Sequence, residues 1–217
     1  MSSVIQHLKA FNRKERFWLV GMALGNKDFE LGAEFRELLN QKLKVNVRPG
    51  AFAAMDYHLD WIYASLFLAS DGHSVAISPT GEPIYQRDQR SKDYLLKATQ
   101  EDVDFLVAYK EDSVCHIILL EAKGETGFTN KQLKSKACRL KAIFEGDEAR
   151  SANACPHFAI VSKHKPVRLK YDCWPNWMHP NGQAAWIQLD MPDGLRKVTR
   201  CDDLGLDDSA GKYWKVD

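Results

Sequence analysis

The sequence predicts a mixed α/β fold, with a central sheet flanked by helices, and three observations support this class. Apolar residues recur at helical spacing in two separate segments, 28–43 and 130–145. Between them, 103–109 and 115–123 have the branched and apolar composition of buried strands. A short apolar strand, 157–162, follows the second helix. Helix, strands, helix and strand in this order are typical of a sheet covered on both faces.

Length and composition indicate a single globular domain. The chain has 217 residues, enough for a full hydrophobic core, and is 45% hydrophobic and 27% charged. Its net charge of +1 gives no strong overall attraction to nucleic acid, so any such attraction requires a local basic patch. Five cysteines without a CxxC pair argue against a disulfide framework or a structural zinc site, and favour a cytoplasmic protein.

The N-terminal part is predicted to be helical. Residues 3–24 are expected to form one or two helices, and their apolar run 17–25 is too short to span a bilayer, so we expect no membrane association. The segment 28–43 is the clearest helix of the chain, because Leu, Phe and Leu recur along one side. Asp28 is the expected N-cap of this helix.

The next part of the chain is less regular. Aromatic and branched residues suggest a strand over 60–69, with 75–78 as its partner, although a helix competes with that strand. Residues 79–100 are polar and contain two prolines, so we expect an insertion or a long loop with one short helix at 91–98.

The two strands 103–109 and 115–123 must be antiparallel, because only a few residues join them. If residues 111–114 form the turn, paired residue numbers sum to 225 and Asp104 lies opposite Glu121. A two-residue turn at 111–112 would give a sum of 223 and place Asp104 diagonal to Glu121 on the same face. Glu-Asp is unfavourable in a two-residue hairpin, so we favour the first register.

The C-terminal half is predicted to continue the sheet. Thr129 is expected to cap the helix 130–145, and this crossover allows 157–162 to run parallel to its neighbour. The tail, 171–217, contains a further predicted strand at 185–189 and a charged, weakly patterned end.

Charged residues at the end of the apolar strand suggest chemistry. Glu121 and Lys123 share one face, about 7 Å apart, while Ala122 points the other way. Asp104 and Glu121 would repel each other unless a divalent cation lay between them, and carboxylates with water suit Mg²⁺. The Ala122 carbonyl can supply a further oxygen, and the lysine can hold a water or neutralise a phosphoryl group. The competing interpretation is an ordinary solvated ion-pair cluster.

This combination resembles the PD-(D/E)xK nuclease superfamily. Asp104 is followed by Glu121-Ala122-Lys123 on a hairpin and then by a helix, and the resemblance covers residues 28–162. The family core is a helix, a three-stranded antiparallel meander, a second helix and a further strand. The proline that often precedes the aspartate is replaced by Val103. The resemblance implies a restriction-endonuclease-like core with an extra N-terminal helix, the insertion at 79–100 and the C-terminal extension.

The resemblance also implies roles for individual residues. Asp104 and Glu121 would be the metal ligands, with the Ala122 carbonyl beside them, and Lys123 would be the catalytic lysine. Mg²⁺ or Mn²⁺ would be the cofactor, and nucleic acid, with DNA preferred, would be the substrate. Cleavage of a duplex by one site per chain would favour a homodimer.

Two helices offer further candidates for the site. Many family members add a glutamate from the first helix, and Glu34 lies nearer the apolar stripe than Glu30 or Glu37. Some members place a Gln or a basic residue on the second helix, where Gln132 and Lys136 lie one turn apart. Solvated surface side chains are the competing interpretation for both helices.

Between residues 121 and 141 there are six basic residues and two acidic ones, the best phosphate-binding patch of the chain. The expected nucleic-acid contacts in it are Lys131, Lys134, Lys136 and Arg139. His116 is expected to pack in the sheet, and His157 has no metal-ligand spacing. Trp174, Trp177 and Trp186 are expected to pack the tail against the core rather than to stack on bases.

The sequence therefore predicts a Mg²⁺-dependent nuclease. The first alternative is a non-catalytic member of the same fold that binds nucleic acid or another partner, although the intact Asp, Glu and Lys argue against it. The second is an unrelated α/β domain with an accidental motif, which predicts that Asp104 and Glu121 do not converge.

Overall fold

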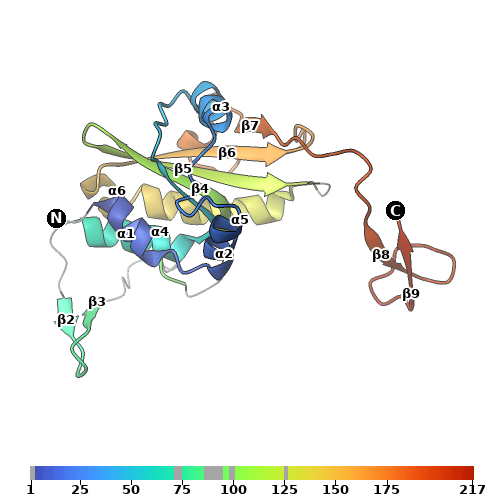
Figure 1. The fold of residues 1–217 in the computed structure, drawn as a ribbon, viewed down its shortest axis with the longest axis horizontal. Helices are drawn as coiled ribbons and strands as arrows, with labels where there is room; N and C mark the ends of the chain where they lie inside the picture. Colours follow the sequence, from blue (N-terminus) through green and yellow to red (C-terminus); the bar gives the residue numbers. More distant parts are fainter. Residues whose placement is uncertain (1–2, 71–74, 86–94, 98–100, 125–126) are drawn as a thin grey trace.

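The protein has a five-stranded central sheet with helices on both faces, and two small hairpins lie outside it (Figure 1). The computed structural model describes residues 3–70, 75–85, 95–97, 101–124 and 127–217. The helices are α1 (Val4–Phe11), α2 (Glu15–Ala23), α3 (Ala33–Leu43), α4 (Leu59–Ala69), α5 (Asn130–Phe144), α6 (Asp147–Ser151) and the 3₁₀ turn η1 (Asn176–Met178). The strands are β1 (Phe52–His58), β2 (Val75–Ile77), β3 (Pro83–Tyr85), β4 (Asp102–Glu111), β5 (Val114–Lys123), β6 (Ala154–Ser162), β7 (Ala185–Gln188), β8 (Val198–Cys201) and β9 (Tyr213–Val216).

The central sheet has the strand order β1-β4-β5-β6-β7. The pairs β1–β4 and β4–β5 are antiparallel, whereas β5–β6 and β6–β7 are parallel. The parallel pairing of β5 and β6 is made through α5, as the sequence predicts. β5 is the middle strand, and it is buried over most of its length because both faces of the sheet are covered.

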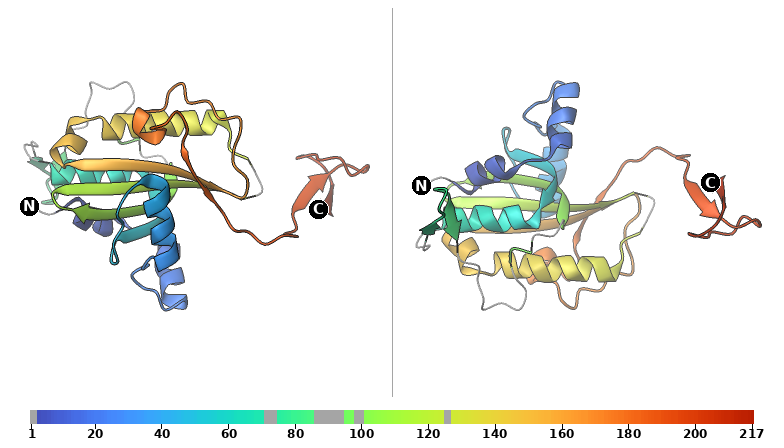
Figure 2. Two further views of the ribbon diagram at one scale, coloured as in Figure 1. Left: turned by 90° about the horizontal axis from the view of Figure 1, so that it is seen from above. Right: turned by 90° about the horizontal axis from the view of Figure 1, so that it is seen from below.

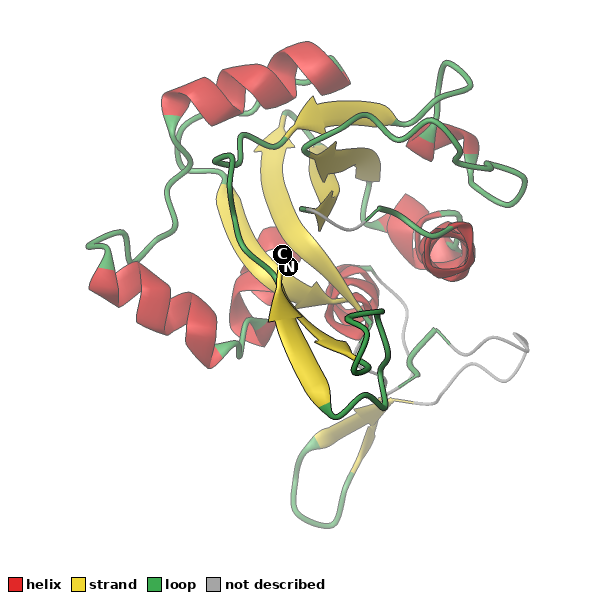
Figure 3. Ribbon diagram, turned by 90° about the vertical axis from the view of Figure 1, so that its right-hand side faces the viewer, coloured by secondary structure: helices red, strands yellow, loops and turns green. Residues whose placement is uncertain are grey.

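The two faces of the sheet are covered by different helices, as Figures 2 and 3 show. On one face, α1, α4 and α5 pack against alternate residues of β5, including Ile117 and Leu119. On the other face, Leu39 of α3 packs in a second core with Ile118 and Leu120. The prediction of helices on both sides of a central sheet is therefore confirmed.

The predicted register of the β4–β5 hairpin is confirmed. Phe105 pairs with Leu120 and Lys110 pairs with Cys115, so paired numbers sum to 225. The turn is shorter than expected, because Glu111 still pairs with Val114 and only two residues lie between them. The first of these, Asp112, has a φ of +50°, a conformation that Asp tolerates better than most residues.

Helix α5 matches its prediction closely. It begins after Thr129, whose side chain accepts a hydrogen bond from the Gln132 backbone N–H. Its apolar line is buried against the sheet. Helix α5 follows β5 in the chain and packs against it, so polar side chains of α5 can reach the charged end of that strand.

Helix α3 is shorter than predicted. It begins at Ala33 with Gly32 as its cap, and Asp28 does not cap it. Asn26 instead bonds to both the N–H and the carbonyl of Glu30, and Phe29 has a φ of +50°. The residues before 33 are therefore a tight loop, because the local side-chain bonds of Asn26 compete with helix formation.

The predicted strand at 60–69 is wrong, because this segment is helix α4. Leu59, Ile62 and Leu66 are fully buried at helical spacing, so the aromatic and branched content reflects burial of a helix and not a strand. The first strand of the sheet is β1, which the sequence analysis missed. β2 pairs with β3 and not with 60–69.

Other predicted segments have mixed outcomes. The short helix expected at 91–98 falls mainly outside the described residues, and 95–97 are not helical. The strand expected at 185–189 is β7, the fifth strand of the sheet, so the C-terminal extension completes the core. Trp174 is buried in that core, with Trp177 and Trp186 packed partly against it, as predicted.

The end of the chain forms a hairpin of β8 and β9, which lies apart from the sheet in both Figure 1 and Figure 2. The sequence shows only a weak pattern there. Within the described residues, no helix combines the length and the apolar character needed to cross a membrane.

Candidate active site

Glu121 is a buried acid at the end of the middle strand. It is 5% exposed and pairs with Ile160 of β6. Its alternation with Ile117 and Leu119 directs its side chain to the face that α5 covers. The pairing with β6 holds its backbone, so the carboxylate is positioned by the sheet and not by a loop.

Asp104 lies where the regular pairing of β4 and β5 stops. The ladder reaches Phe105–Leu120, and beyond it Asp104 Oδ2 accepts a hydrogen bond of 2.6 Å from the backbone N–H of Ala122. The aspartate side chain thus bonds the neighbouring strand in place of a ladder contact. Its carboxylate is fixed in the gap between the two strands, near enough to Glu121 for its charge to raise the pKa of that carboxyl.

The pairing of β1 with β4 is also interrupted at Asp104. The β1–β4 pairing runs through Met55–Phe105 and resumes at Tyr57–Val103, so Asp56 and Asp104 are skipped. Asp56 has a φ of +49°. On β4, Phe105 packs on the α3 face while Val103 packs on the α5 face, so the alternation of faces reverses at Asp104.

Lys136 of α5 neutralises Glu121. Its Nζ forms an ion pair with Glu121 Oε1 and donates to the Asp102 carbonyl oxygen at 2.5 Å. Both side chains are largely buried, with 14% of Lys136 and 7% of Glu121 exposed. The sequence analysis expected Lys136 to contact nucleic acid, but its ammonium group is engaged by the protein.

The surroundings of Glu121 make its charge costly. Burial raises the pKa of this carboxyl from its ordinary value of 4.5 to about 7. Lys136 lowers the pKa, whereas the nearby charge of Asp104 raises it, and Lys123 lowers it by a smaller amount. One lysine in direct contact therefore does not offset the desolvation of this pair of carboxylates.

Lys123 extends the same face by one step and pairs with Ser162 of β6. It is half-buried, and its charge reaches Glu121 electrostatically. Across the described ranges, Lys123 forms no hydrogen bond or ion pair, whereas Lys136 forms both.

The oxygen atoms around Asp104 fit a hard divalent cation. Asp104 uses Oδ2 for the Ala122 N–H, which leaves Oδ1 as an acceptor. In an antiparallel ladder the N–H and the C=O of one residue point to the same side, so the Ala122 carbonyl is directed to the β4 side as well. Two carboxylates and a carbonyl are ligands that Mg²⁺ or Mn²⁺ accepts. The residues present therefore fit the cofactor that the motif implies.

A second charged group adjoins the site and was not predicted. The Asp102 carboxylate lies 3.1 Å from Lys14 Nζ and 2.6 Å from His58 Nδ1. The ring of Trp61 meets that of His58 edge-on, with centroids 4.4 Å apart. The alternation of Asp102 with Asp104 was a signal in the sequence, but Lys14 and His58 come from distant segments that carry no motif.

Arg139 does not belong to a nucleic-acid surface, which corrects the prediction. Only 2% of its side chain is exposed, and it pairs with Glu101 at 3.1 Å and with Asp60 at the start of α4. The guanidinium therefore ties α5 to α4 and to Glu101, the residue directly before β4. Its role is to hold these elements together.

The remaining predicted residues are on the surface. Lys131, Lys134 and Gln132 are exposed on the first turns of α5, where Gln132 Oε1 accepts a bond of 3.0 Å from the Thr129 hydroxyl. Glu34 is exposed on α3, which covers the face opposite to the one that Glu121 points to. Among the described residues, the structure shows no hydrogen bond or ion pair between the two carboxylates and either Glu34 or Gln132.

Searches against protein-family models, curated proteins and solved structures give no match for this chain.

Proposed function

We propose that this protein is a Mg²⁺-dependent nuclease that hydrolyses phosphodiester bonds, with DNA as the expected substrate. One observation carries the proposal: Asp104 is bonded to the backbone of Ala122 beside the buried Glu121, with Lys123 on the same strand end. The convergence of Asp104 and Glu121 argues against the accidental-motif alternative, which predicts that they lie apart.

The order of elements supports the same proposal. A helix, three antiparallel strands, a second helix and a parallel strand follow one another as α3, β1, β4, β5, α5 and β6. This is the order that the resemblance to PD-(D/E)xK nucleases implies, with β1 in place of the strand expected at 60–69. The predicted insertion at 79–100 then lies between β1 and β4, after α4.

In this mechanism the bound Mg²⁺ would supply Lewis-acid stabilisation of the phosphoryl oxygens. Asp104, Glu121 and the Ala122 carbonyl would hold it. Lys123 would orient the attacking water and offset the charge that develops on the phosphoryl group. Lys136 would keep Glu121 paired before the cation binds, which limits the cost of a buried carboxylate.

Substrate binding is expected to use the exposed part of α5. Lys131 and Lys134 are exposed close to its N-terminus, and the helix begins just after the end of β5. Lysines on this side can contact phosphates next to the scissile one, without reading base sequence. Two such chains acting on opposite strands of a duplex would form the expected homodimer.

The Glu121–Lys136 ion pair favours one alternative, a non-catalytic module of the same fold. In that case Lys136 neutralises Glu121 permanently and no cation is bound. The two functions differ in whether a divalent cation competes with the lysine for this carboxylate.

The test is cleavage of plasmid, linear duplex and single-stranded DNA, and of RNA, with Mg²⁺ or Mn²⁺. We expect Lys123→Ala and Asp104→Asn to lower the cleavage rate by about 100-fold or more, while Lys110→Ala, an exposed lysine at the other end of β4, retains it. Equal rates in the wild type and Lys123→Ala, or no cleavage of any substrate with either metal, would reject the nuclease. Binding of DNA without cleavage would favour the non-catalytic module.

A further inference from the structure

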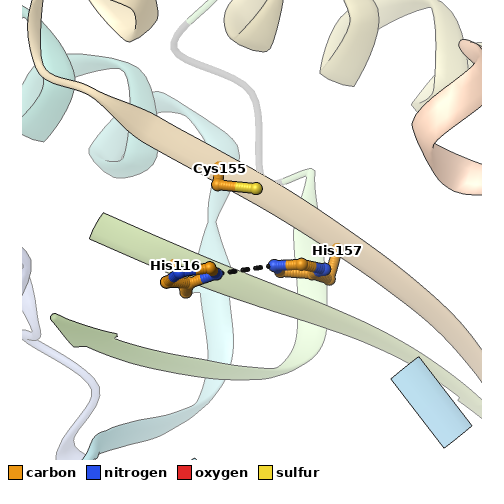
Figure 4. A group of neighbouring side chains, drawn as sticks. All are labelled: His116, Cys155 and His157. Atoms are coloured by element: carbon orange, nitrogen blue, oxygen red, sulfur yellow. Dashed lines mark hydrogen bonds between the residues drawn. The ribbon is translucent and has the colours of Figure 1, made fainter. Parts of the chain in front are cut away.

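Two histidines and a cysteine converge on the sheet, away from the proposed nuclease site. His116 of β5 pairs in register with Cys155 of β6, and His157 follows two residues later on β6. One ligand atom from each of the three lies within 4.8 Å of the others (Figure 4). The closest contact is a hydrogen bond of 2.9 Å between His116 Nδ1 and His157 Nε2.

The position of this cluster separates it from the carboxylates. His116 alternates with Ile118 and Leu120, so it lies on the α3 face, whereas Glu121 points to the α5 face. His116 is near the start of β5 and Glu121 is near its end, so about 16 Å of strand lies between them. A ligand at one place cannot contact the other.

From this geometry we propose that His116, Cys155 and His157 form a second metal site, for Zn²⁺ or a similar borderline transition-metal ion. Two imidazoles and a thiolate are the ligand set that Zn²⁺ selects, whereas Mg²⁺ prefers hard oxygen atoms. Because the three side chains are half-buried and not sealed, a water completes the four-coordinate shell.

The distance between the two histidines requires only a small adjustment. With Zn–N bonds of about 2.0–2.1 Å, two tetrahedral nitrogen ligands lie about 3.3 Å apart. The two histidine nitrogens are 2.9 Å apart in the hydrogen-bonded state, so they need to separate by a few tenths of an ångström. Rotation of the imidazoles can supply this, because both rings come from fixed positions on adjacent strands.

Neighbouring side chains hold the ring of His116 in place. Its ring stacks on Tyr109 with centroids 4.9 Å apart and planes at 7°. Its other nitrogen, Nε2, lies 3.9 Å from Glu111 Oε2, and Asn46 donates to the other oxygen of that carboxylate at 2.8 Å. A carboxylate behind a ligating histidine is the usual way to fix its tautomer and orientation.

Binding has a definite proton balance. The proton between His116 Nδ1 and His157 Nε2 must move to the outer nitrogen of its own ring, so that both inner nitrogens offer lone pairs to the metal. The Cys155 thiol releases one proton to solvent and binds as the thiolate. One proton is therefore released per ion bound when both rings begin neutral.

This group of three residues could not be predicted from the spacing of histidines and cysteines along the sequence. His116 and His157 are 41 residues apart, and no CxxC or H-x₃-H pattern marks them. The parallel pairing of β5 and β6, established only through α5, brings them together. The absence of a CxxC pair excludes zinc sites built from local motifs, but not a site whose ligands lie on neighbouring strands.

The test is a titration of the tag-free protein with Co²⁺, followed by displacement with Zn²⁺. We expect one Co²⁺ per chain, visible ligand-field bands and a thiolate-to-Co²⁺ charge-transfer band in the near ultraviolet. Cys155→Ser should abolish the charge-transfer band, and His157→Gln should weaken Zn²⁺ binding by about 10-fold or more. The control variants Cys138→Ser and His164→Ala alter an exposed cysteine and an exposed histidine elsewhere, and should bind as the wild type does.

Circular dichroism of the metal-free variants tests whether each one is folded. If His157→Gln does not fold, His116→Asn is used in its place. No saturable binding, a charge-transfer band that persists in Cys155→Ser, or equal loss in Cys138→Ser would overturn the proposal. The Glu121→Gln variant should keep the full Co²⁺ spectrum, so failure of this site and failure of the nuclease site are separable.

Discussion

The buried carboxyl of Glu121 predicts an unusual dependence of stability on pH. Its pKa in the folded protein is about 7, against an ordinary value of 4.5. The folded protein therefore holds this proton more tightly than the unfolded chain does, so stability decreases as the pH rises from 4.5 to about 7. Most paired acids have a lowered pKa in the folded protein, so their contribution to stability increases as the pH rises.

The size of the effect follows from the difference in pKa. A difference of one in pKa is worth about 1.4 kcal/mol, so the rise from 4.5 to about 7 corresponds to a loss on the order of 3 kcal/mol above neutral pH. Such a loss is a large part of the stability of an ordinary domain. The carboxyl is 5% exposed, so solvent screens it little.

The assay is urea unfolding of the wild type and Glu121→Gln at several pH values from 4.5 to 8. Glutamine keeps the shape of the side chain and removes the titration, so the difference between the two curves isolates Glu121 from every other group. We expect the variant to gain on the order of 3 kcal/mol relative to the wild type across this range. Glu145→Gln, at the exposed end of α5, should stay parallel to the wild type.

Adding Mg²⁺ connects this measurement to the proposed function. A cation that binds the ionised carboxylates stabilises the wild type most at pH 8, where Glu121 is charged, and has little effect on Glu121→Gln. Parallel stability curves for wild type and variant, or a wild type that becomes relatively more stable as the pH rises, would refute the electrostatic reasoning. An absent response to Mg²⁺ would count against the metal site alone.

Three further outcomes are expected around α5. Thr129→Ala removes the N-cap and should lower the free energy of unfolding by about 1 kcal/mol, measured by urea denaturation beside Thr199→Ala as a distant control. Arg139→Met removes the cation that Asp60 and Glu101 share and should cost about 3–5 kcal/mol in the same assay, whereas an effect on DNA affinity with no loss of stability would contradict its structural role. Lys131→Ala and Lys134→Ala should leave stability unchanged and each reduce the slope of log affinity for DNA against log salt by about one, whereas unchanged slopes would place the DNA surface elsewhere.

The parts of the fold predicted well are those with strong local signals. The β4–β5 hairpin has two apolar strands joined by a short polar turn, and the chemistry of that turn favoured the correct register over its neighbour. Helix α5 has both a capping threonine and an apolar line. These signals need no knowledge of the rest of the chain.

Errors arose where burial outweighs local preference. Helix α4 is apolar on most sides, because it packs between the sheet, α1 and the segment around α6, and such a helix resembles a strand in composition. Strand β1 escaped prediction because small residues such as Ala53 and Ala54 fill its fully buried centre. A helix period and a strand period cannot be separated when every position is apolar.

In the candidate site as well, residues with a local motif were predicted, whereas contacts that depend on packing were not. The Asp, Glu and Lys of the motif are close in sequence and were predicted together, whereas Lys136 was assigned to the ligand instead of to Glu121. The sequence places Lys136 on the correct helix, but only the packing of α5 on β5 shows which partner its ammonium group reaches. His58 and Lys14 depend on the docking of α1, α2 and β1, which no local pattern specifies.

The irregularity at Asp104 changes which groups this hairpin presents at the proposed cation site. Continued alternation would direct the Asp104 side chain straight to the α5 face, as the register alone implies. Instead the alternation reverses there, the neighbouring Asp56 adopts a positive φ, and the Asp104 carboxylate lies in the gap between strands on the Ala122 N–H. Asp accepts this backbone conformation at a small cost, and the gap brings a side-chain carboxylate and a main-chain carbonyl together. The distortion of β1 therefore helps to position the proposed ligands on β4 and β5, although β1 itself supplies no residue of the motif.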